Sequence, residues 1–188
     1  MNRLITREAV NDLPIRRYEG EICLVDSPER LERAREDFAV ETVVGFDTET
    51  RPSFHKGQVH LPALVQAATA SAVYLFQLRR PEVFPVLAGM LESESTVKAG
   101  VAVADDLRSL KLVFPFEPRK VADVGVLAKR AGIGQSGVRN LAALLLGFRI
   151  AKGSRTSNWA APQLSPAQVV YAATDAWACR ELYLRLSA

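Results

Sequence analysis

The stretch VVGFDTET, residues Val43–Thr50, is the part of the sequence on which both the fold and the chemistry depend. Its first four residues are mostly apolar and partly β-branched, which predicts a buried strand. Asp47 and Glu49 follow, and residues two apart on a strand point to the same face. Two carboxylates held side by side raise each other's pKa unless a cation lies between them. Hard divalent cations such as Mg²⁺ bind such oxygen clusters, although two solvated acids at a strand end would give the same pattern.

Short apolar runs on either side of this stretch predict a mixed α/β chain. Strands are expected at residues 21–25, 43–48, 64–69, 72–77, 96–101 and 120–124, and helices at 28–38, 81–91, 105–114, 126–131, 138–146 and 166–186. The third and fourth of these strands are joined by a short turn, which predicts a hairpin. Three meandering strands followed by strand–helix units suit a ribonuclease H-like fold, with a mixed central sheet of about five to six strands flanked by helices.

Length and composition favour one domain. The chain has 188 residues, of which 21–188 are expected to form a single domain and 1–20 an irregular N-terminal arm that is either wrapped on the domain or partly disordered. A net charge of +3 permits a polyanionic partner without requiring one. No apolar run is long enough to span a bilayer, and the N-terminus does not read as a signal peptide. Two cysteines provide neither a disulfide framework nor a metal spacing, so a reduced, cytoplasmic protein without a membrane partner is expected.

Two further acids, Asp105 and Asp106, follow the strand predicted at 96–101. Aspartate is favoured at a helix N-cap and in the first turn, so one of the two is expected at one of these positions of the next helix. The other is placed to project into a shared site at the carboxyl ends of the strands, where ligands often bind in α/β sheets.

Tyr171 and Asp175 lie four residues apart in the helix predicted at 166–186, so both should point the same way. Because apolar residues surround it, Asp175 is expected to be partly buried and to need a partner. That partner is either an arginine such as Arg139 or Arg180, or a metal site shared with the other acids.

Together, these segments resemble the three exonuclease motifs of the DEDD superfamily, in its DEDDy branch. Residues 46–50 (FDTET) resemble the first motif, 104–110 (ADDLRSL) the second and 171–175 (YAATD) the third. The spacing to the leucines of the second motif selects Asp106 over Asp105. Any one of these motifs is weak evidence, but the three in order are specific.

Residues 152–176 are most similar to the ribonuclease D family and to the exonuclease domain of the Werner helicase. The resemblance covers roughly residues 21–186. The sequence ends within one helix of Asp175, so the accessory helical domains of ribonuclease D are not expected. This feature is closer to the Werner-type single domain, and it leaves the substrate open.

The resemblance implies a metal-dependent 3′-5′ exonuclease that releases nucleoside 5′-monophosphates from the 3′ end of DNA or RNA. Two Mg²⁺ or Mn²⁺ ions would be held by Asp47, Glu49, Asp106 and Asp175, and Tyr171 would orient the attacking water. The implied partner is a single-stranded or 3′-recessed nucleic acid.

The candidates for substrate binding are Thr48, Arg51, Phe54, Lys56, Leu64, Lys152 and Arg155. The basic residues are candidates for phosphate contacts, and Phe54, Leu61 or Leu64 for contact with the terminal base. Three other interpretations remain open at this stage. They are a non-catalytic nucleic-acid-binding domain with an exonuclease-like fold, a metal-dependent hydrolase of small nucleotides, and a metal-free structural domain.

Overall fold

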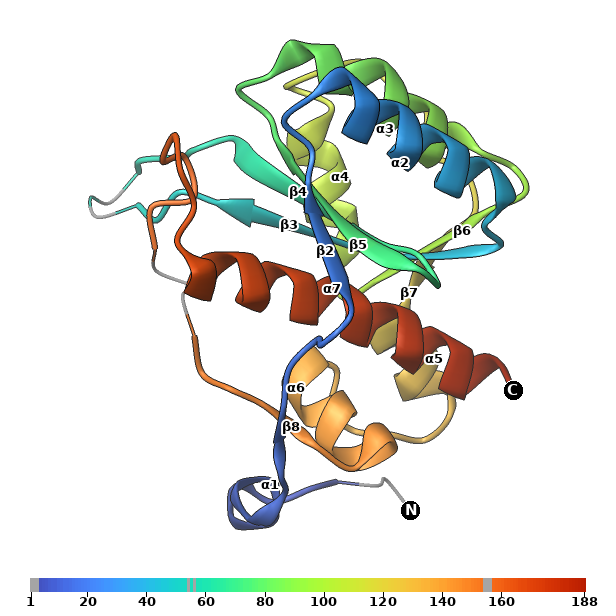
Figure 1. Cartoon of the computed structure of the whole chain (residues 1–188). Coiled ribbons are helices and arrows are strands. Elements are labelled where there is room, and N and C mark those ends of the chain that lie inside the picture. The colour runs from blue at the N-terminus through green and yellow to red at the C-terminus, as the bar shows by residue number, and fades with distance from the viewer. Residues whose placement is uncertain (1–3, 54, 56, 154–156) are drawn as a thin grey trace.

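A six-stranded mixed sheet forms the centre of the computed structural model (Figure 1), which describes residues 4–53, 55, 57–153 and 157–188. The strands, in sheet order, are β2 (Glu21–Leu24), β5 (Ala72–Gln77), β4 (Pro62–Ala68), β3 (Val43–Thr50), β6 (Val97–Gly100) and β7 (Val121–Asp123). β3 pairs antiparallel with β4 and parallel with β6, while β4 and β5 form the predicted hairpin. The six strands and their mixed order confirm the expected sheet.

Helices cover both faces of this sheet (Figure 1). One face carries α2 (Pro28–Val40), the 3₁₀ turn η1 (Pro81–Val83), α3 (Phe84–Glu92) and α4 (Val103–Leu110). The other carries α7 (Pro166–Ser187), with α5 (Val124–Arg130), α6 (Val138–Leu141) and the π-helical segment η2 (Ala142–Leu146). No helix of the described residues is both long and apolar enough to cross a membrane.

The two faces of β3 serve different purposes. Val44 and Phe46 are buried in the cluster formed with α2, α3 and α4. Gly45 faces α7 instead, and a Cβ added there would overlap the carbonyl oxygen of Ala176. The absence of a side chain at Gly45 therefore lets α7 pack directly on the backbone of β3, beside the strand positions of Asp47 and Glu49.

From residue 4 onward the N-terminal arm is packed on the domain, as one of the two expectations had it, but it is more regular than the sequence predicted. It contains α1 (Arg7–Asp12), whose N-cap Thr6 accepts a hydrogen bond from the Ala9 amide, and β1 (Ile15–Arg16). β1 pairs in parallel with β8 (Arg149–Ile150) to form a separate two-stranded sheet. α1 contains no buried residue, so its sequence lacks the apolar periodicity by which helices are predicted.

Replacing Gly45 by alanine tests the contact between β3 and α7. Because the new methyl group would overlap the backbone of α7, we expect Gly45→Ala to lower the free energy of unfolding by about 3 kcal/mol. Gly89→Ala is the matched control, since a Cβ there has no neighbour within 4 Å. Gly89 lies inside helix α3, so Gly89→Ala should raise the free energy of unfolding by up to about 1 kcal/mol. Chemical denaturation of both variants measures the difference, and equal effects would contradict this account of the packing.

Candidate functional site

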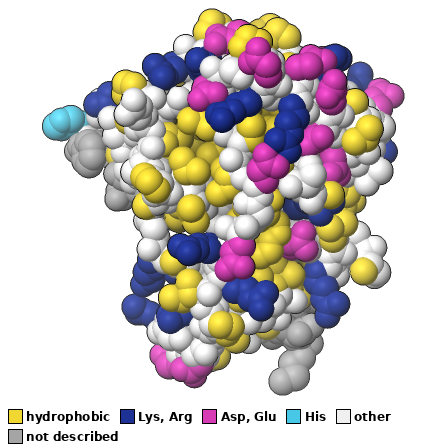
Figure 2. Space-filling view, viewed as in Figure 1, with side chains coloured by type: hydrophobic (Ala, Val, Ile, Leu, Met, Phe, Trp, Pro, Cys, Tyr) yellow, Lys and Arg dark blue, Asp and Glu magenta, His cyan; other side chains and the backbone are white. Residues whose placement is uncertain are grey.

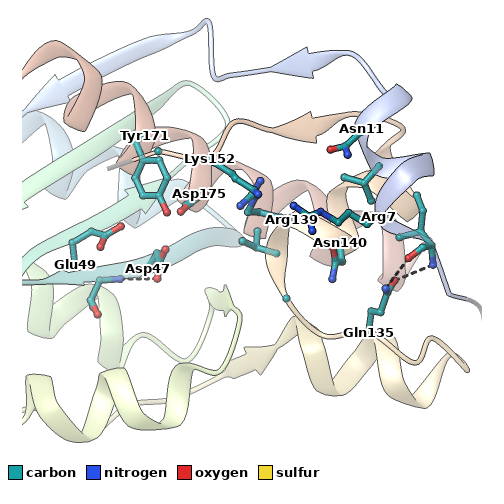
Figure 3. Close-up of a pocket in the computed structure, with 16 residues that line it drawn as sticks. Arg7, Asn11, Asp47, Glu49, Gln135, Arg139, Asn140, Lys152, Tyr171 and Asp175 are labelled. Carbon is teal, nitrogen blue, oxygen red and sulfur yellow. Dashed lines mark hydrogen bonds between the residues drawn. The ribbon is translucent and has the colours of Figure 1, made fainter. Parts of the chain in front are cut away.

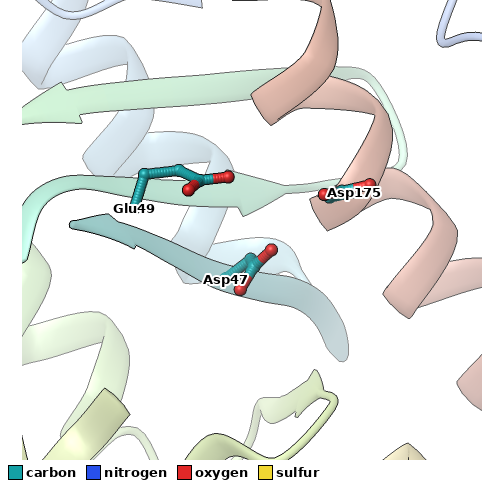
Figure 4. A group of neighbouring side chains, drawn as sticks. All are labelled: Asp47, Glu49 and Asp175. Atoms are coloured by element: carbon teal, nitrogen blue, oxygen red, sulfur yellow. The ribbon is translucent and has the colours of Figure 1, made fainter. Parts of the chain in front are cut away.

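Three carboxylates converge where β3 meets α7 (Figure 4). One oxygen each from Asp47, Glu49 and Asp175 lies within 4.8 Å of the others. Glu49 is 9% exposed and Asp175 is 6% exposed, so the group is largely removed from water. The convergence arises because β3 places Asp47 and Glu49 on the face against which α7 packs.

Burial and mutual repulsion both disfavour the charged forms of these acids. Burial, followed by the charges of the neighbouring carboxylates, raises the pKa of Asp47 well above its ordinary value. Burial also raises the pKa of Asp175 to about 6, although the Tyr171 hydroxyl and the Arg139 guanidinium oppose this shift. A cation placed among the three carboxylates would favour their charged forms.

The donor set fits a hard divalent cation. Oδ1 of Asp175 is buried and has no hydrogen-bond partner among the described residues. Leaving a buried carboxylate oxygen unsatisfied is costly, and Mg²⁺, Mn²⁺ and similar ions are bound by such oxygens. Asp47, Glu49 and Asp175 are therefore the residues suited to hold a metal.

Gln66 is a polar residue at this site that the sequence did not reveal. It lies directly opposite Asp47 on β4, is fully buried, and both polar atoms of its amide lack a partner within the described chain. Since paired residues on adjacent strands share a face, the amide lies beneath α7 with Asp47. Buried polar groups are normally hydrogen-bonded. Several that lack a hydrogen-bond partner at one place therefore indicate that further polar atoms can bind there.

Asp106 approaches β3 from α4 and is not one of the three converging acids. The Thr48 hydroxyl donates a hydrogen bond of 2.6 Å to Asp106 Oδ1. The charge of Asp106 nevertheless contributes to the raised pKa of Asp47. Asp106 is thus an outer acid of the site, and its part in metal binding remains a prediction.

Neither aspartate of the second motif is the N-cap of α4, but both lie in its first turn, the other position that the sequence favours for them. α4 begins at Val103, and its N-cap is Ala102, in the left-handed conformation at φ 55°. Asp105 forms an ion pair with Arg108 at 2.7 Å. Both aspartates still lie in the first turn of α4, where they face the positive end of the helix dipole.

Tyr171 stands beside the carboxylates on the same face of α7 as Asp175 (Figure 3). Burial and the charge of Asp175 raise the pKa of the Tyr171 phenol, which therefore keeps its proton at neutral pH. Gly153 packs on the ring, because a Cβ at that position would overlap ring carbon Cδ2. Trp159 is fully buried, with its ring centre 6.0 Å from that of Tyr171, so it supports the phenol from the core.

The alternative in which an arginine pairs with Asp175 is not what the structure shows. Arg180 lies 3.6 Å from Glu41 and donates a hydrogen bond to the Val43 carbonyl. Within the described part of the chain, no ion pair involves Asp175. Arg139 influences its pKa but forms no salt bridge with it.

The carboxylates open onto a cleft of about 840 Å³. Lys152 and Arg139 lie in its middle, and Arg7 and Asn11 of α1 lie at the far end from the acids (Figure 3). Of these four residues, only Lys152 was predicted to contact the substrate, and Arg139 was considered only as a partner for Asp175. Arg7 and Asn11 carry no sequence signal, since they reach the cleft only when the N-terminal arm folds against residues 135–140.

The remaining substrate candidates have different outcomes. Thr48 lines the cleft, but its hydroxyl is engaged by Asp106. Leu64 is completely buried in the core next to Trp159, so it offers no surface to a base and that prediction was wrong. Arg51 is exposed and is not among the described residues that line the cleft. Phe54, Lys56 and Arg155 lie outside the described residues.

Comparison with known proteins places the fold and sequence among nucleases. The 3′-5′ exonuclease family model matches residues 22–188. Ribonuclease D of Gluconacetobacter diazotrophicus is 34% identical over 164 residues, which cover 85% of this chain and 41% of that protein. The EXO domain of Aedes aegypti Nibbler superposes with a TM-score of 0.79 at 24% identity, covering 93% of this chain and 90% of that one, which confirms the ribonuclease H-like fold.

A third match is Brucella melitensis NrnC, whose structure was solved bound to pGG. It has a TM-score of 0.72 and 26% identity, and the match covers 90% of this chain and 81% of that one.

The raised pKa of Asp175 predicts a pH-dependent cost to the metal-free fold. A carboxyl group whose pKa is raised on folding destabilises the folded state as pH rises from the unfolded value, near 4, to about 6. In EDTA at pH 7, we therefore expect Asp175→Asn to be more stable than wild type by on the order of 2 kcal/mol. The difference should shrink toward zero near pH 4.

Denaturant titrations in EDTA and in Mn²⁺ provide the measurement. Mn²⁺ should stabilise the wild type and have little effect on Asp175→Asn, because the variant has lost one of the carboxylates. A wild type that is more stable than the variant in EDTA at pH 7 would show that the carboxylates do not strain the fold.

Proposed function

Because the chain belongs to the 3′-5′ exonuclease family, as its three motifs predicted, we propose that it hydrolyses DNA or RNA from the 3′ end and releases nucleoside 5′-monophosphates. The observation that carries this proposal is the convergence of Asp47, Glu49 and Asp175 within 4.8 Å, in a cleft beside Tyr171. The chain spans 41% and 43% of the length of two ribonuclease D relatives. Only the residues of this domain support the activity that we propose.

Asp47, Glu49 and Asp175 would hold Mg²⁺ or Mn²⁺, with Asp106 as an outer acid for a second ion. When bound, such ions lower the pKa of water and balance the negative charge of the phosphate. The carboxylates themselves repel a phosphodiester, so they serve to fix the cations and do not contact the substrate directly. Their burial keeps their positions fixed within the packing of β3 and α7.

Tyr171 is proposed to position the attacking water. Its phenol keeps its proton, lies beside Asp175 and faces the cleft. With that proton directed to the carboxylate, the phenol oxygen has a lone pair with which to accept a hydrogen bond from water. Gly153 and Trp159 hold the ring in place, so the water would be aligned without loss of side-chain freedom at each turnover.

Nucleic acid is the proposed partner, and cations in the cleft support it. Lys152 and Arg139 line the cleft next to the acids and are suited to phosphate oxygens. The similar protein NrnC was solved bound to pGG. Cys23 and Cys179 are both free and buried, and the reduced, cytoplasmic location that the sequence predicts remains a proposal.

Digestion of labelled oligonucleotides tests the proposed activity and the role of Tyr171. With Mn²⁺, the wild type should shorten a strand stepwise from its 3′ end, and Asp175→Asn should be inactive. Tyr171→Phe should lower kcat by about a hundredfold with little change in oligonucleotide binding, since it removes only a water-positioning oxygen. Tyr183→Phe, on the same helix but outside the described cleft lining, is the matched control.

Matched DNA and RNA strands, single-stranded and 3′-recessed, would define the substrate. Binding without any product would favour a non-catalytic nucleic-acid-binding domain. Hydrolysis of free nucleoside triphosphates with no shortening of strands would favour a hydrolase of small nucleotides.

A further inference from the structure

The N-terminal arm forms one wall of the cleft that holds the carboxylates. The arm precedes residue 22, where the family match begins. Its residues Ile5, Arg7, Val10 and Asn11 nevertheless line the same cleft as Asp47 and Asp175. The site of this chain is therefore extended by a segment outside the matched exonuclease domain.

Specific contacts fix the arm in this place. The Ile5 amide donates to Gln135 Oε1 at 3.1 Å, and Gln135 Nε2 donates back to the Ile5 carbonyl at 2.9 Å (Figure 3). Further along, the Tyr18 amide donates to the hydroxyl of Thr174, the residue before Asp175. A six-residue helix is too short to be stable alone, so the position of α1 depends on these contacts and on the pairing of β1 with β8.

The cleft between the acids and the arm carries a row of cations. Figure 3 shows the carboxylates at one end, Lys152 and Arg139 in the middle, and Arg7 at the other end. None of these three cations forms a salt bridge with any described residue, and Arg139 Nε is buried without a hydrogen-bond partner. Figure 2 shows Lys and Arg side chains in the lower half of the molecule together with Asp and Glu side chains, so the cleft residues themselves, and not the surface around α1, define the cationic row. Cations left without partners beside an acidic site are suited to an extended anion.

We propose that this row, ending at Arg7 of the arm, binds the phosphates on the 5′ side of the bond that is cut. The proposal rests on the 3′-5′ exonuclease function proposed above. In that reaction, only a single nucleoside with a free hydroxyl lies on the 3′ side of the attacked phosphate. Every further phosphate of the strand is on the 5′ side, so a cationic row leading away from the carboxylates meets those phosphates alone. The substrate class is a single-stranded oligonucleotide long enough to reach the arm.

Arg7→Ala should therefore weaken the enzyme only toward strands that reach the arm. We expect kcat/KM for a hexanucleotide to fall about tenfold, mainly through KM. For a dinucleotide with a 5′-hydroxyl, whose one phosphate is the one attacked, the change should stay within about twofold. Arg17→Ala is the matched control, because it removes the same charge from the same arm at an exposed position outside the described cleft lining. It should affect neither substrate.

Equilibrium binding provides a readout that does not require turnover. In an Asp175→Asn background, Arg7→Ala should raise the Kd of a fluorescent hexanucleotide about tenfold. It should also make the salt dependence of log K shallower by about 0.7, the value expected when the protein neutralises one phosphate fewer on a single strand. Gln135→Ala, which removes both hydrogen bonds to Ile5, should reproduce the weaker binding of the longer strand.

Equal losses on both substrates, or an unchanged salt slope, would overturn the role of the arm. If the wild type cut neither substrate, the proposed exonuclease function would fail. The binding comparison between Arg7→Ala and Arg17→Ala would still decide whether the arm contacts the strand.

Discussion

Mutual repulsion among Asp47, Glu49 and Asp175 is the constraint around which this domain is built. Three carboxylates within 4.8 Å, largely shielded from water, would separate if their supporting elements could move. The packing of α7 on β3 prevents this. Gly45 admits the helix backbone, and the alanines of α7 that face the sheet, Ala172, Ala173 and Ala176, are completely buried. Small residues on both sides of the interface keep the two elements close, so the repulsion is offset by contacts that involve no charge.

The side chains of β3 alternate between the two faces of the sheet, and each face has a different function. Val44 and Phe46 join the apolar core on one face, and the carboxylates occupy the other. Thr48 lies between these acids along the chain and faces α4, where its hydroxyl bonds Asp106. This bond connects the second motif to the first across the strand. Contacts on the face of β3 that packs against α4 therefore fix the position of Asp106. Contacts on the face under α7 fix Asp47, Glu49 and Asp175.

Much of this architecture could be predicted from sequence, because it depends on local spacing. The strand around Asp47, the hairpin after it and the i, i+4 pair on α7 all follow from strand or helix periodicity. The start of α4 could not be predicted, since it depends on the left-handed conformation of Ala102, which is rare for alanine. Leu64 was misplaced because β4 is buried on both faces, so a run of apolar residues does not show which of them reach solvent.

Two of the three cations of the cleft, Arg7 and Arg139, were missed as substrate contacts for a different reason, which also shows how the site balances its charge. Arg7, Arg139 and Lys152 are far apart in sequence and come together only through tertiary contacts. Arg139 acts on both parts of the cleft, because its charge favours the ionised form of Asp175 while its side chain lines the path toward α1. The acids must stay charged to hold metal, and a polyanion must approach them against that charge. A positive group between the acids and the arm both keeps the acids ionised and attracts the polyanion. Arg139 is placed to do this for metal binding and for strand binding.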